Sequence, residues 1–303
     1  MKQVIHIGGN KTASTLFQRH LFAVHPKIAY IGEDCTNYKE INQTLALLIH
    51  EDDSFYNETA AREIFKQTPN QPEKKVLVFS CEDIMGTRHP SVCARRLKNL
   101  MPEAQVTMVI RNQLTVWRSW YINHGAYLKL VPRRYWRRYV GFDEWLEYCF
   151  SFPYQTPVEA MNYNRYYDTF SKFFGAANMR VIVYEDLKTN PQKFFDEWAD
   201  ILDLSTRELK DYLSNKSERP RNSQRRFKYH QWSAYAPEFF KKNVESLLEK
   251  WLDRGKPAEI AIPDKWIQQI NSYYGPGNKA LAEKTNLDIK TLGYPHNDQV
   301  PYL

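Results

Sequence analysis

The sequence predicts an α/β fold in which a parallel sheet is flanked by helices. Short apolar runs alternate with longer segments whose apolar residues have helical spacing, which is the pattern of strands joined by crossover helices. The first run, Val4–Ile7, is followed at once by a glycine turn and a helix start. We expect a single domain over residues 1–303, because no Gly/Ser/Pro-rich linker, internal repeat or low-complexity tract divides the chain.

The expected strands, each a short apolar run, are residues 4–8, 28–31, 75–80, 105–110 and 179–184. The expected helices are residues 12–24, 38–68 with a break near Asp52-Asp53, 90–100 with Ser91 as a candidate cap, 113–125, 131–152, 162–174 and 191–202. His25-Pro26 stops the first of these helices, and Gly175 stops the one before the last strand. The final third is expected to be mainly helical, with irregular joints at residues 219–226 and at Gly275-Pro276-Gly277.

The turn after the first strand has the composition of an anion site. Gly8-Gly9-Asn10 is followed by Lys11 and by small and hydroxylic residues that lead into a helix. The first N–H groups of a helix are unpaired and its dipole favours negative charge, so a phosphate group is the expected ligand. Lys11 adds a full positive charge.

A nucleotide triphosphatase loop does not fit this spacing. Such a loop needs glycine immediately before the lysine and again five residues earlier, where this chain has Asn10 and Ile5. A Mg²⁺ site would also need an acid after a neighbouring strand, but strand 105–110 is followed by Arg111. Glu185-Asp186, after strand 179–184, is the one acidic pair that could hold Mg²⁺ instead, so a nucleotide kinase is a minor alternative.

Three segments together resemble sulfotransferases that use 3′-phosphoadenosine 5′-phosphosulfate (PAPS). Lys11–Thr15 is similar to the K-[ST]-G-[ST]-[ST] loop of that family, and Arg111-Asn112-Gln113, with Ser119 eight residues beyond Arg111, is similar to its R-N-P…S segment. The segment 181–187, with Asn190-Pro191 behind it, is similar to the family's YEDL…P strand and turn. The matches occur in family order over residues 4–205.

The resemblance implies a P-loop-like nucleotide-binding sulfotransferase fold with PAPS as cofactor. It assigns the 5′-phosphosulfate to the loop residues Asn10, Lys11, Thr12, Ala13, Ser14 and Thr15, and the 3′-phosphate to Arg111 and Ser119. A late basic segment with Arg221 and Asn222 is a weaker candidate for closing over the cofactor. Ala13 replaces the usual glycine, so its backbone is expected to use a conformation open to residues with a Cβ. Gln113 replaces the usual proline and removes only a φ restraint.

The expected chemistry is transfer of a sulfuryl group to an acceptor hydroxyl, which needs a cation near the leaving phosphate and a general base near the acceptor. Lys11 is the candidate for the first role. Glu33 is favoured as the base, because Tyr30–Cys35 after His25-Pro26 resembles the HP…GE segment of glycan sulfotransferases. Glu82, just past strand 75–80, is the second candidate, and His124 is a further one.

The acceptor is expected to be a carbohydrate or glycoconjugate. Residues 131–139 interleave cations with aromatic side chains and could form a sugar-binding wall, although an amphipathic helix with its aromatic residues packed inward would have the same pattern. A small-molecule or lipid acceptor stays open. So does a nucleic-acid-binding role, since the net charge of +7 suits several kinds of anion, but no nucleic-acid partner is expected.

The remaining composition points to a cytoplasmic protein without metal. The eight histidines and four cysteines show no zinc-ligand spacing and no disulfide-framework density, which fits a reducing compartment. The first strand begins by Val4, so no signal peptide is expected, and no apolar stretch reaches the ~20 residues needed to span a bilayer.

Overall fold

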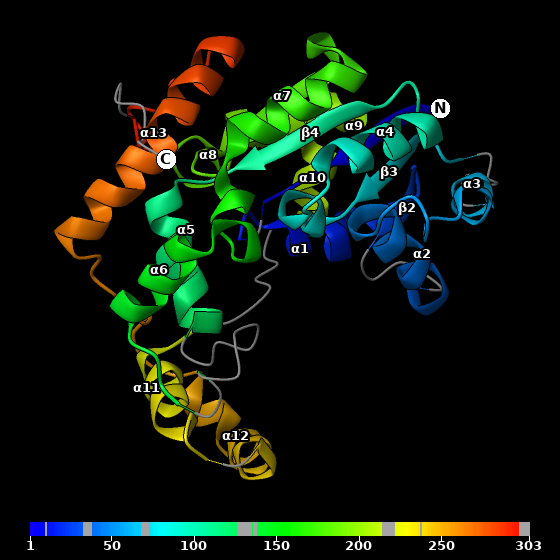
Figure 1. Ribbon diagram of the computed structural model, residues 1–303. Coiled ribbons are helices and arrows are strands. Elements are labelled where there is room, and N and C mark those ends of the chain that lie inside the picture. The colour runs from blue at the N-terminus through cyan, green and yellow to red at the C-terminus, as the bar shows by residue number, and fades with distance from the viewer. Residues whose placement is uncertain are drawn as a thin grey trace.

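The computed structural model describes residues 1–9, 11–32, 38–67, 73–125, 135, 138–213, 222–236 and 238–296. Its sheet has five strands, which are β1 (Lys2–His6), β2 (Ile28–Gly32), β3 (Val76–Ser80), β4 (Gln105–Ile110) and β5 (Met179–Val183). They are all parallel, in the order β2-β3-β1-β4-β5. The predicted α/β fold with a parallel sheet flanked by helices is therefore confirmed (Figure 1).

The helices of the described residues follow the predicted alternation. In chain order they are α1 (Ser14–Phe17), α2 (Tyr38–His50), α3 (Glu58–Gln67), α4 (Pro90–Leu100), α5 (Gln113–Trp120), α6 (Phe142–Ser151), α7 (Tyr163–Phe174), α8 (Asp186–Thr189), α9 (Pro191–Leu202), α10 (Thr206–Leu213), α11 (Gln224–Ser233), α12 (Glu238–Leu252) and α13 (Asp264–Thr285). Short helical segments of tighter or wider winding are η1 (Gln18–Phe22), η2 (Glu82–Gly86), η3 (Tyr121–Gly125), η5 (Pro153–Gln155), η6 (Glu159–Met161) and η7 (Ala176–Asn178).

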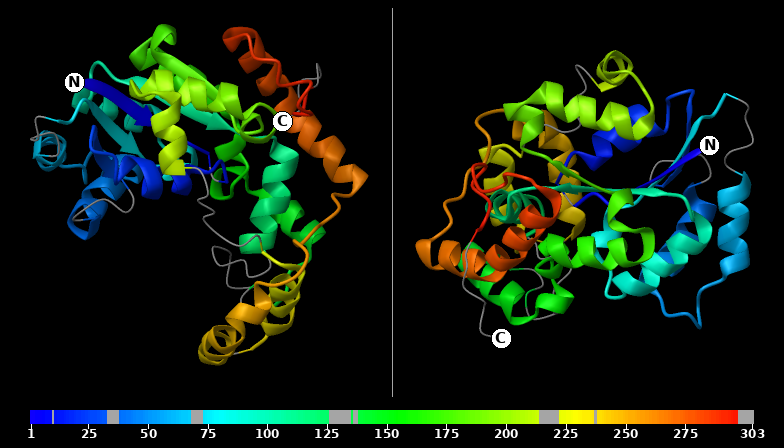
Figure 2. Two further views of the ribbon diagram at one scale, coloured as in Figure 1. Left: turned by 180° about the vertical axis from the view of Figure 1, so that it is seen from behind. Right: turned by 90° about the horizontal axis from the view of Figure 1, so that it is seen from above.

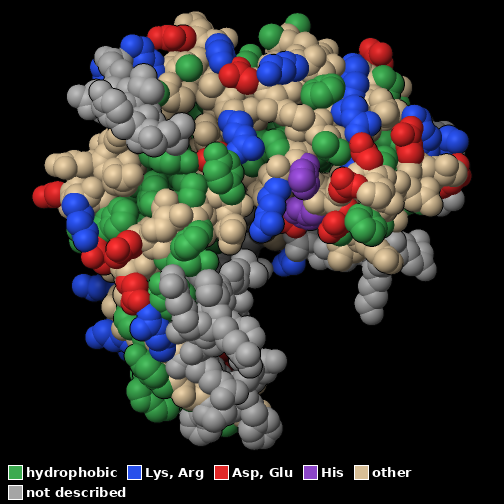
Figure 3. Space-filling model, in the orientation of Figure 1, with side chains coloured by type: hydrophobic (Ala, Val, Ile, Leu, Met, Phe, Trp, Pro, Cys, Tyr) green, Lys and Arg blue, Asp and Glu red, His purple; other side chains and the backbone are tan. Residues whose placement is uncertain are grey.

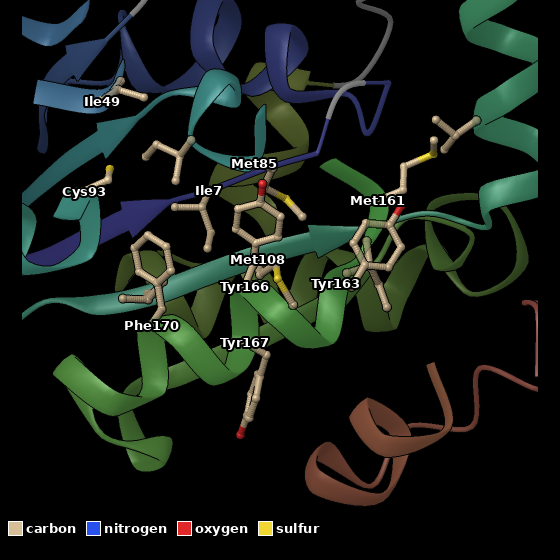
Figure 4. Packing of buried hydrophobic residues seen from close by; sticks show 14 of the residues in the cluster. Ile7, Ile49, Met85, Cys93, Met108, Met161, Tyr163, Tyr166, Tyr167 and Phe170 are labelled. Atoms are coloured by element: carbon tan, nitrogen blue, oxygen red, sulfur yellow. The ribbon is translucent and has the colours of Figure 1, made fainter. Parts of the chain in front are cut away.

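Alternating strand residues divide the core into two layers, because successive side chains of a strand point to opposite faces. Val4 of β1 packs with α1, η1, α9 and α10, whereas Ile5 packs with α4 and α7 on the other face. Figure 4 shows α7, with Tyr166 and Phe170, running alongside β4, which carries Met108, in that second layer. Helices thus cover both faces of the sheet, as Figure 2 also shows.

The order of the strands creates a topological switch point between β1 and β4 at the carboxyl edge of the sheet. From β1 the chain continues to β2 on one side, and from β4 it continues to β5 on the other side. Ligands of open α/β sheets bind where two neighbouring strands send their connections in opposite directions. The loops that follow β1 and β4 flank this point.

Helices α5, η3, α6, α11 and α12 extend from the carboxyl edge as a lobe (Figure 1). Figure 3 shows that this face of the molecule is hollowed between the lobe and the part that holds the sheet, with basic, acidic and histidine side chains at the rim of the sheet part. None of the helices in the described part of the chain is long and apolar enough to cross a membrane.

Three details of the sequence prediction are wrong. The first is the predicted helix 131–152. Of its residues from 138 on, which the structure describes, only Phe142–Ser151 are helical. The predicted joint Gly275–Gly277 lies inside α13. Helix α4 begins at Pro90, with His89 rather than Ser91 at its cap.

Tertiary packing explains why α13 continues through its glycines and proline. Gly275 and Asn278 are buried, and the Asn278 amide bonds Gln113 at the start of α5 and the carbonyl of Pro295. Gly277 packs beside Asn162, where a Cβ would make an ordinary contact of 3.4 Å with Asn162 Oδ1. These contacts outweigh the local helix-breaking tendency.

Buried Arg96 holds the end of α2 against α4. Its side chain is 1% exposed, and its Nη1 donates to the carbonyls of Leu47, Leu48 and Glu51 at 3.0, 3.0 and 2.8 Å. Asp53 accepts two further bonds from the same guanidinium. The arginine therefore satisfies carbonyl groups at the carboxyl end of the helix.

We expect Arg96→Met to lower the free energy of unfolding by about 3 kcal/mol, because the buried carbonyls lose their donors. Arg95→Met is the matched control. Arg95 also binds Asp53, at 2.6 Å, but its side chain is 44% exposed, and such pairs contribute at most about 1 kcal/mol. Denaturant unfolding measures both variants, and equal losses would contradict this account of Arg96.

Candidate functional site

The loop after β1 lies close against the end of its own strand. A Cβ on Gly8 would lie 2.5 Å from His6 Nε2 and 2.6 Å from Ser14 Oγ, so only glycine fits there. The Gly9 N–H donates to the carbonyl of Val109 in β4 at 3.2 Å. Thr12 Oγ1 donates to the Gly9 carbonyl at 2.5 Å and lies 3.1 Å from Ser14 Oγ. The glycine pair thus brings the loop over both β1 and β4.

Two residues of this loop have left-handed backbone conformations. They are Lys11, with φ 69°, and Ala13, with φ 64° and ψ 18°. The expectation for Ala13 was wrong, because it adopts the region that the usual glycine of the motif enters without strain. Ala13 is the N-cap of α1, which continues into the wider η1 and makes a helical stretch from Ser14 to Phe22. The N–H groups of Ser14 and Thr15 therefore have no helical carbonyl to bind.

Arg111 joins the two predicted anion sites. Its Nη1 donates to the carbonyl of Lys11 at 2.7 Å, although 100 residues separate them in sequence. Its Nε donates to Thr115 Oγ1 at 3.0 Å, and its guanidinium lies 4.6 Å from the centre of the Tyr184 ring. The structure therefore brings the lysine loop and the arginine together at the β1/β4 switch point, as the sequence predicted.

The residues after Arg111 anchor this edge of the sheet to the C-terminal part of the chain. Asn112 caps α5 through Leu114 N and donates to the carbonyls of Leu292 and Gly293 at 3.2 and 2.7 Å. Glu185 accepts from Asn112 N at 3.0 Å and from Tyr294 Oη at 2.6 Å. These contacts are structural, and no sequence pattern indicated them.

The acidic pair that a magnesium site would need is engaged elsewhere. Glu185 makes the two bonds above, and Asp186 accepts a bond from Lys193 Nζ at 2.7 Å. Within the described part of the chain, no three His, Cys, Asp or Glu side chains are grouped as metal ligands.

Ser119 and Asn222 come together through an asparagine that the sequence analysis missed. Asn123 Nδ2 donates to the Ser119 carbonyl at 2.6 Å, and Asn222 Nδ2 donates to Asn123 Oδ1 at 2.7 Å. Ser223, next to Asn222, is buried and caps α11 through Arg226 N, so its hydroxyl has a structural partner. The late basic segment therefore contacts the helix that carries Ser119.

Several predicted site residues lie outside the described residues. They are Asn10, Glu33 and Arg221, and of His124 only the backbone is described. Much of the aromatic and basic segment 131–139 also falls outside. Its described members Tyr135 and Tyr139 are in packing positions. Tyr135 is 7% exposed and contacts the Tyr148 ring edge-on, and the Tyr139 hydroxyl bonds Tyr121 and Gln231.

Glu82 begins η2 and lines a cavity of about 300 Å³ at the carboxyl ends of β2 and β3. Gly32, which directly precedes Glu33, lines the same cavity and pairs with Ser80 in the sheet. A Cβ on Gly32 would lie 2.3 Å from the Ser80 carbonyl, so glycine is required at this strand end. Glu82 therefore lies at this cavity, and Gly32, the last described residue before Glu33, lines it as well.

A buried polar group underlies the loop and this cavity. His6 Nδ1 lies 2.7 Å from Ser80 Oγ, which also accepts a bond from Gln18 Nε2 at 3.0 Å. His6 is 1% exposed, and burial lowers its pKa to about 3, so its ring is neutral at physiological pH. Sequence analysis did not single out this histidine, although a polar residue within an apolar strand was a visible signal.

His6 is expected to make stability depend on pH. The unfolded chain binds a proton at this imidazole below about pH 6.5 and the folded protein does not, so stability falls as the pH drops. The expected loss from His6 between pH 7 and pH 5 is about 2 kcal/mol. Burial lowers the pKa of His25 as well, so His25 also makes the protein less stable as the pH falls.

Replacing His6 by asparagine should therefore weaken the dependence of the free energy of unfolding on pH without removing it. Urea unfolding of wild type and His6→Asn at a series of pH values measures the difference. If the free energy of unfolding depends on pH equally in the two proteins, His6 has the same pKa in the folded and unfolded states, which would contradict this prediction.

No protein-family model and no curated protein matches this chain. Among solved structures, the chain is similar to the crystal structure of a sulfotransferase from Alicyclobacillus acidocaldarius. The two share 16% sequence identity with a TM-score of 0.47, over 82% of this chain and 96% of that chain.

Proposed function

We propose that this protein is a PAPS-dependent sulfotransferase. The observation that carries the proposal is the bond from Arg111 to the Lys11 carbonyl, which joins two cationic residues that follow the neighbouring strands β1 and β4. PAPS carries anionic groups on both sides of its adenosine, so its binding needs two such sites. The guanidinium group of Arg111 suits bidentate phosphate binding. The loop contributes both the Lys11 ammonium group and the backbone N–H groups at the start of a helix.

The residues present fit the donor set that PAPS needs. We assign the 5′-phosphosulfate to Lys11, Thr12, Ser14 and Thr15, and the 3′-phosphate to Arg111 with Ser119. When PAPS is bound, the acceptor oxygen bonds to sulfur while the bond from sulfur to the bridging phosphate oxygen breaks, and the acceptor proton goes to a base. Lys11 stabilises the charge on the leaving oxygen. Glu33 and Glu82 are the candidate bases.

We further propose a hydroxyl acceptor of the carbohydrate type and a reducing compartment such as the cytoplasm. Support for the acceptor class is the cavity beside Glu82, which has polar and apolar walls. Support for the compartment comes from Cys81, Cys93 and Cys149, which are free thiols.

Thermal melting with 3′-phosphoadenosine 5′-phosphate (PAP) tests the cofactor assignment. A ligand at 100 times its Kd adds about 2.7 kcal/mol to stability, which shifts Tm by several degrees. We expect this shift with PAP, less with AMP and none specific to ATP·Mg²⁺. A shift with ATP·Mg²⁺ and none with PAP would overturn the sulfotransferase proposal and favour a kinase.

Arg111→Ala should reduce the melting shift with PAP more than the shift with AMP, which can fall only through the lost bond to the Lys11 carbonyl. The reason is that Arg111 is assigned to the 3′-phosphate, which AMP lacks, and a charge-assisted bond to it is worth several kcal/mol when buried. Arg118→Ala is the matched control, because Arg118 is an exposed arginine on α5, the helix that follows Arg111 in the chain. An unchanged PAP shift in Arg111→Ala would place the 3′-phosphate elsewhere.

A further inference from the structure

Helices α11 and α12 expose large apolar side chains at the end of the lobe. Figure 1 shows the two helices side by side at the end furthest from the sheet. On α12, Leu247 is 85% exposed and Trp251, four residues later on the same side of the helix, is 52% exposed. Leu248 beside them and Trp232 on α11 are exposed as well. Exposed apolar side chains that are grouped in this way mark an interaction site.

A basic residue joins the exposed sides of the two helices. The guanidinium of Arg225 on α11 lies 4.9 Å from the centre of the Trp251 ring on α12. Lys228 and Trp232 follow Arg225 by about one and two helical turns, so they lie on the same side of α11. These residues form one surface, which we call the α11–α12 surface, made of Arg225, Lys228, Trp232, Leu247, Leu248 and Trp251.

Positive charge surrounds the apolar side chains of this surface. Glu245 and Asp253 each bind Arg226 at 2.6 Å, so these two acids lie in the contact between the helices. Glu249 lies one turn beyond Glu245 on the same side of α12. In residues 222–236 and 243–256 it is the one exposed acid, whereas the exposed cations are Arg225, Lys228, Lys250, Arg254 and Lys256. The surface therefore fits a partner that combines negative charge with an apolar region.

We infer that the α11–α12 surface docks on a membrane that contains anionic phospholipids. Leucine and tryptophan side chains with lysine and arginine beside them are typical of helices that lie in the membrane interface. Leu247 and Trp251 enter the boundary between the headgroups and the acyl chains, while Arg225 and Lys228 pair with lipid phosphates. The inference is independent of the proposed sulfotransferase function.

Two other occupants fit the surface less well. A second copy of this chain, related by a two-fold axis through the surface, would bring the cations of one copy against those of the other. Single-stranded nucleic acid would use aromatic rings for stacking, but the most exposed apolar side chain here is the aliphatic Leu247. An anionic membrane matches both the charge and the leucines.

Flotation with lipid vesicles tests the inference. We expect the protein to float with vesicles of phosphatidylglycerol and phosphatidylcholine in equal amounts, and to bind vesicles of phosphatidylcholine alone much more weakly. Raising the salt concentration should weaken binding to the anionic vesicles, because salt screens charges at the surface. Equal binding to both kinds of vesicle, or binding to neither, would overturn the inference.

Variants of the surface separate its apolar and electrostatic parts. Leu247→Ala should lower the affinity for anionic vesicles by about tenfold, since an inserted leucine side chain returns to water on dissociation. Lys228→Glu should lower it by at least about fivefold, which is the contribution of one cation near an anionic membrane surface. Both side chains are exposed, so both variants should keep the melting temperature of wild type.

Two variants outside the lobe are the matched controls. Phe55→Ala removes an apolar side chain that is 66% exposed in the connection between α2 and α3, and Lys172→Glu reverses an exposed charge on α7. Neither should change vesicle binding. Losses in the controls as large as those in Leu247→Ala and Lys228→Glu would show that the α11–α12 surface has no special part in binding.

The other occupants are recognised by separate measurements. A dimer in sedimentation equilibrium that Leu247→Ala dissociates would show that a second copy covers the surface. Affinity for oligo(dT) that Lys228→Glu abolishes, in a protein that does not float with anionic vesicles, would assign the surface to nucleic acid. Either result would overturn the membrane inference and leave the sulfotransferase proposal to its own test with PAP.

Discussion

Lys11→Ala is expected to abolish sulfuryl transfer while the fold stays intact. Lys11 is the cation placed at the leaving phosphate, and removing one stabilising donor of this kind typically costs about 100- to 1,000-fold in kcat. The backbone carbonyl of Lys11, which binds Arg111, remains in the variant. Alanine also tolerates the φ of 69° about as well as lysine does, so the loop should keep its path.

Turnover with labelled PAPS, together with a PAP melting curve, measures this prediction. Lys98→Ala is the matched control, since Lys98 lies on α4, where its Nζ bonds the Pro102 carbonyl and lies 5.2 Å from the centre of the Phe174 ring. Lys11→Arg should recover part of the activity by restoring the charge. Wild-type turnover in Lys11→Ala would end the assignment of Lys11 to the leaving group.

A comparison of Glu33→Gln with Glu82→Gln is expected to identify the general base. The glutamine that replaces the base cannot accept the acceptor proton, so kcat should fall by about 100- to 10,000-fold while the PAP melting shift is retained. The sequence resemblance favours Glu33. Glu82 is the candidate whose place at the cavity is described.

The pH dependence of kcat distinguishes the base from a carboxylate that only binds the acceptor. Protonation of the base makes kcat fall at low pH, which is the acid limb of the profile. Loss of the base removes this acid limb, whereas loss of a binding group raises KM and leaves it in place. Glu63→Gln, an exposed residue of α3, is the control. If both site variants keep the limb, neither glutamate is the base and His124 becomes the next candidate.

The strands and the chemistry at their ends were predictable because both are local properties. Every predicted strand is present within two residues at each end, since each is a short apolar run between turn residues. In a parallel sheet all carboxyl ends meet at one edge, so Lys11 and Arg111 could be placed near each other before any coordinates were considered. The aromatic segment 131–139 was ambiguous because inward packing and ligand binding use the same residue types.

The amino-acid sequence alone predicted the α/β class, which is confirmed, and an anion-binding loop after the first strand with cationic residues on two strand ends. Those features depend on spacing along a few neighbouring residues. Only the tertiary structure decided that Arg111 bonds the Lys11 carbonyl, that Asn123 links Ser119 to Asn222, and that one face of α2 closes a cavity over Glu82. Each of these contacts joins segments that are distant in sequence, and such pairings arise only when helices pack on the sheet.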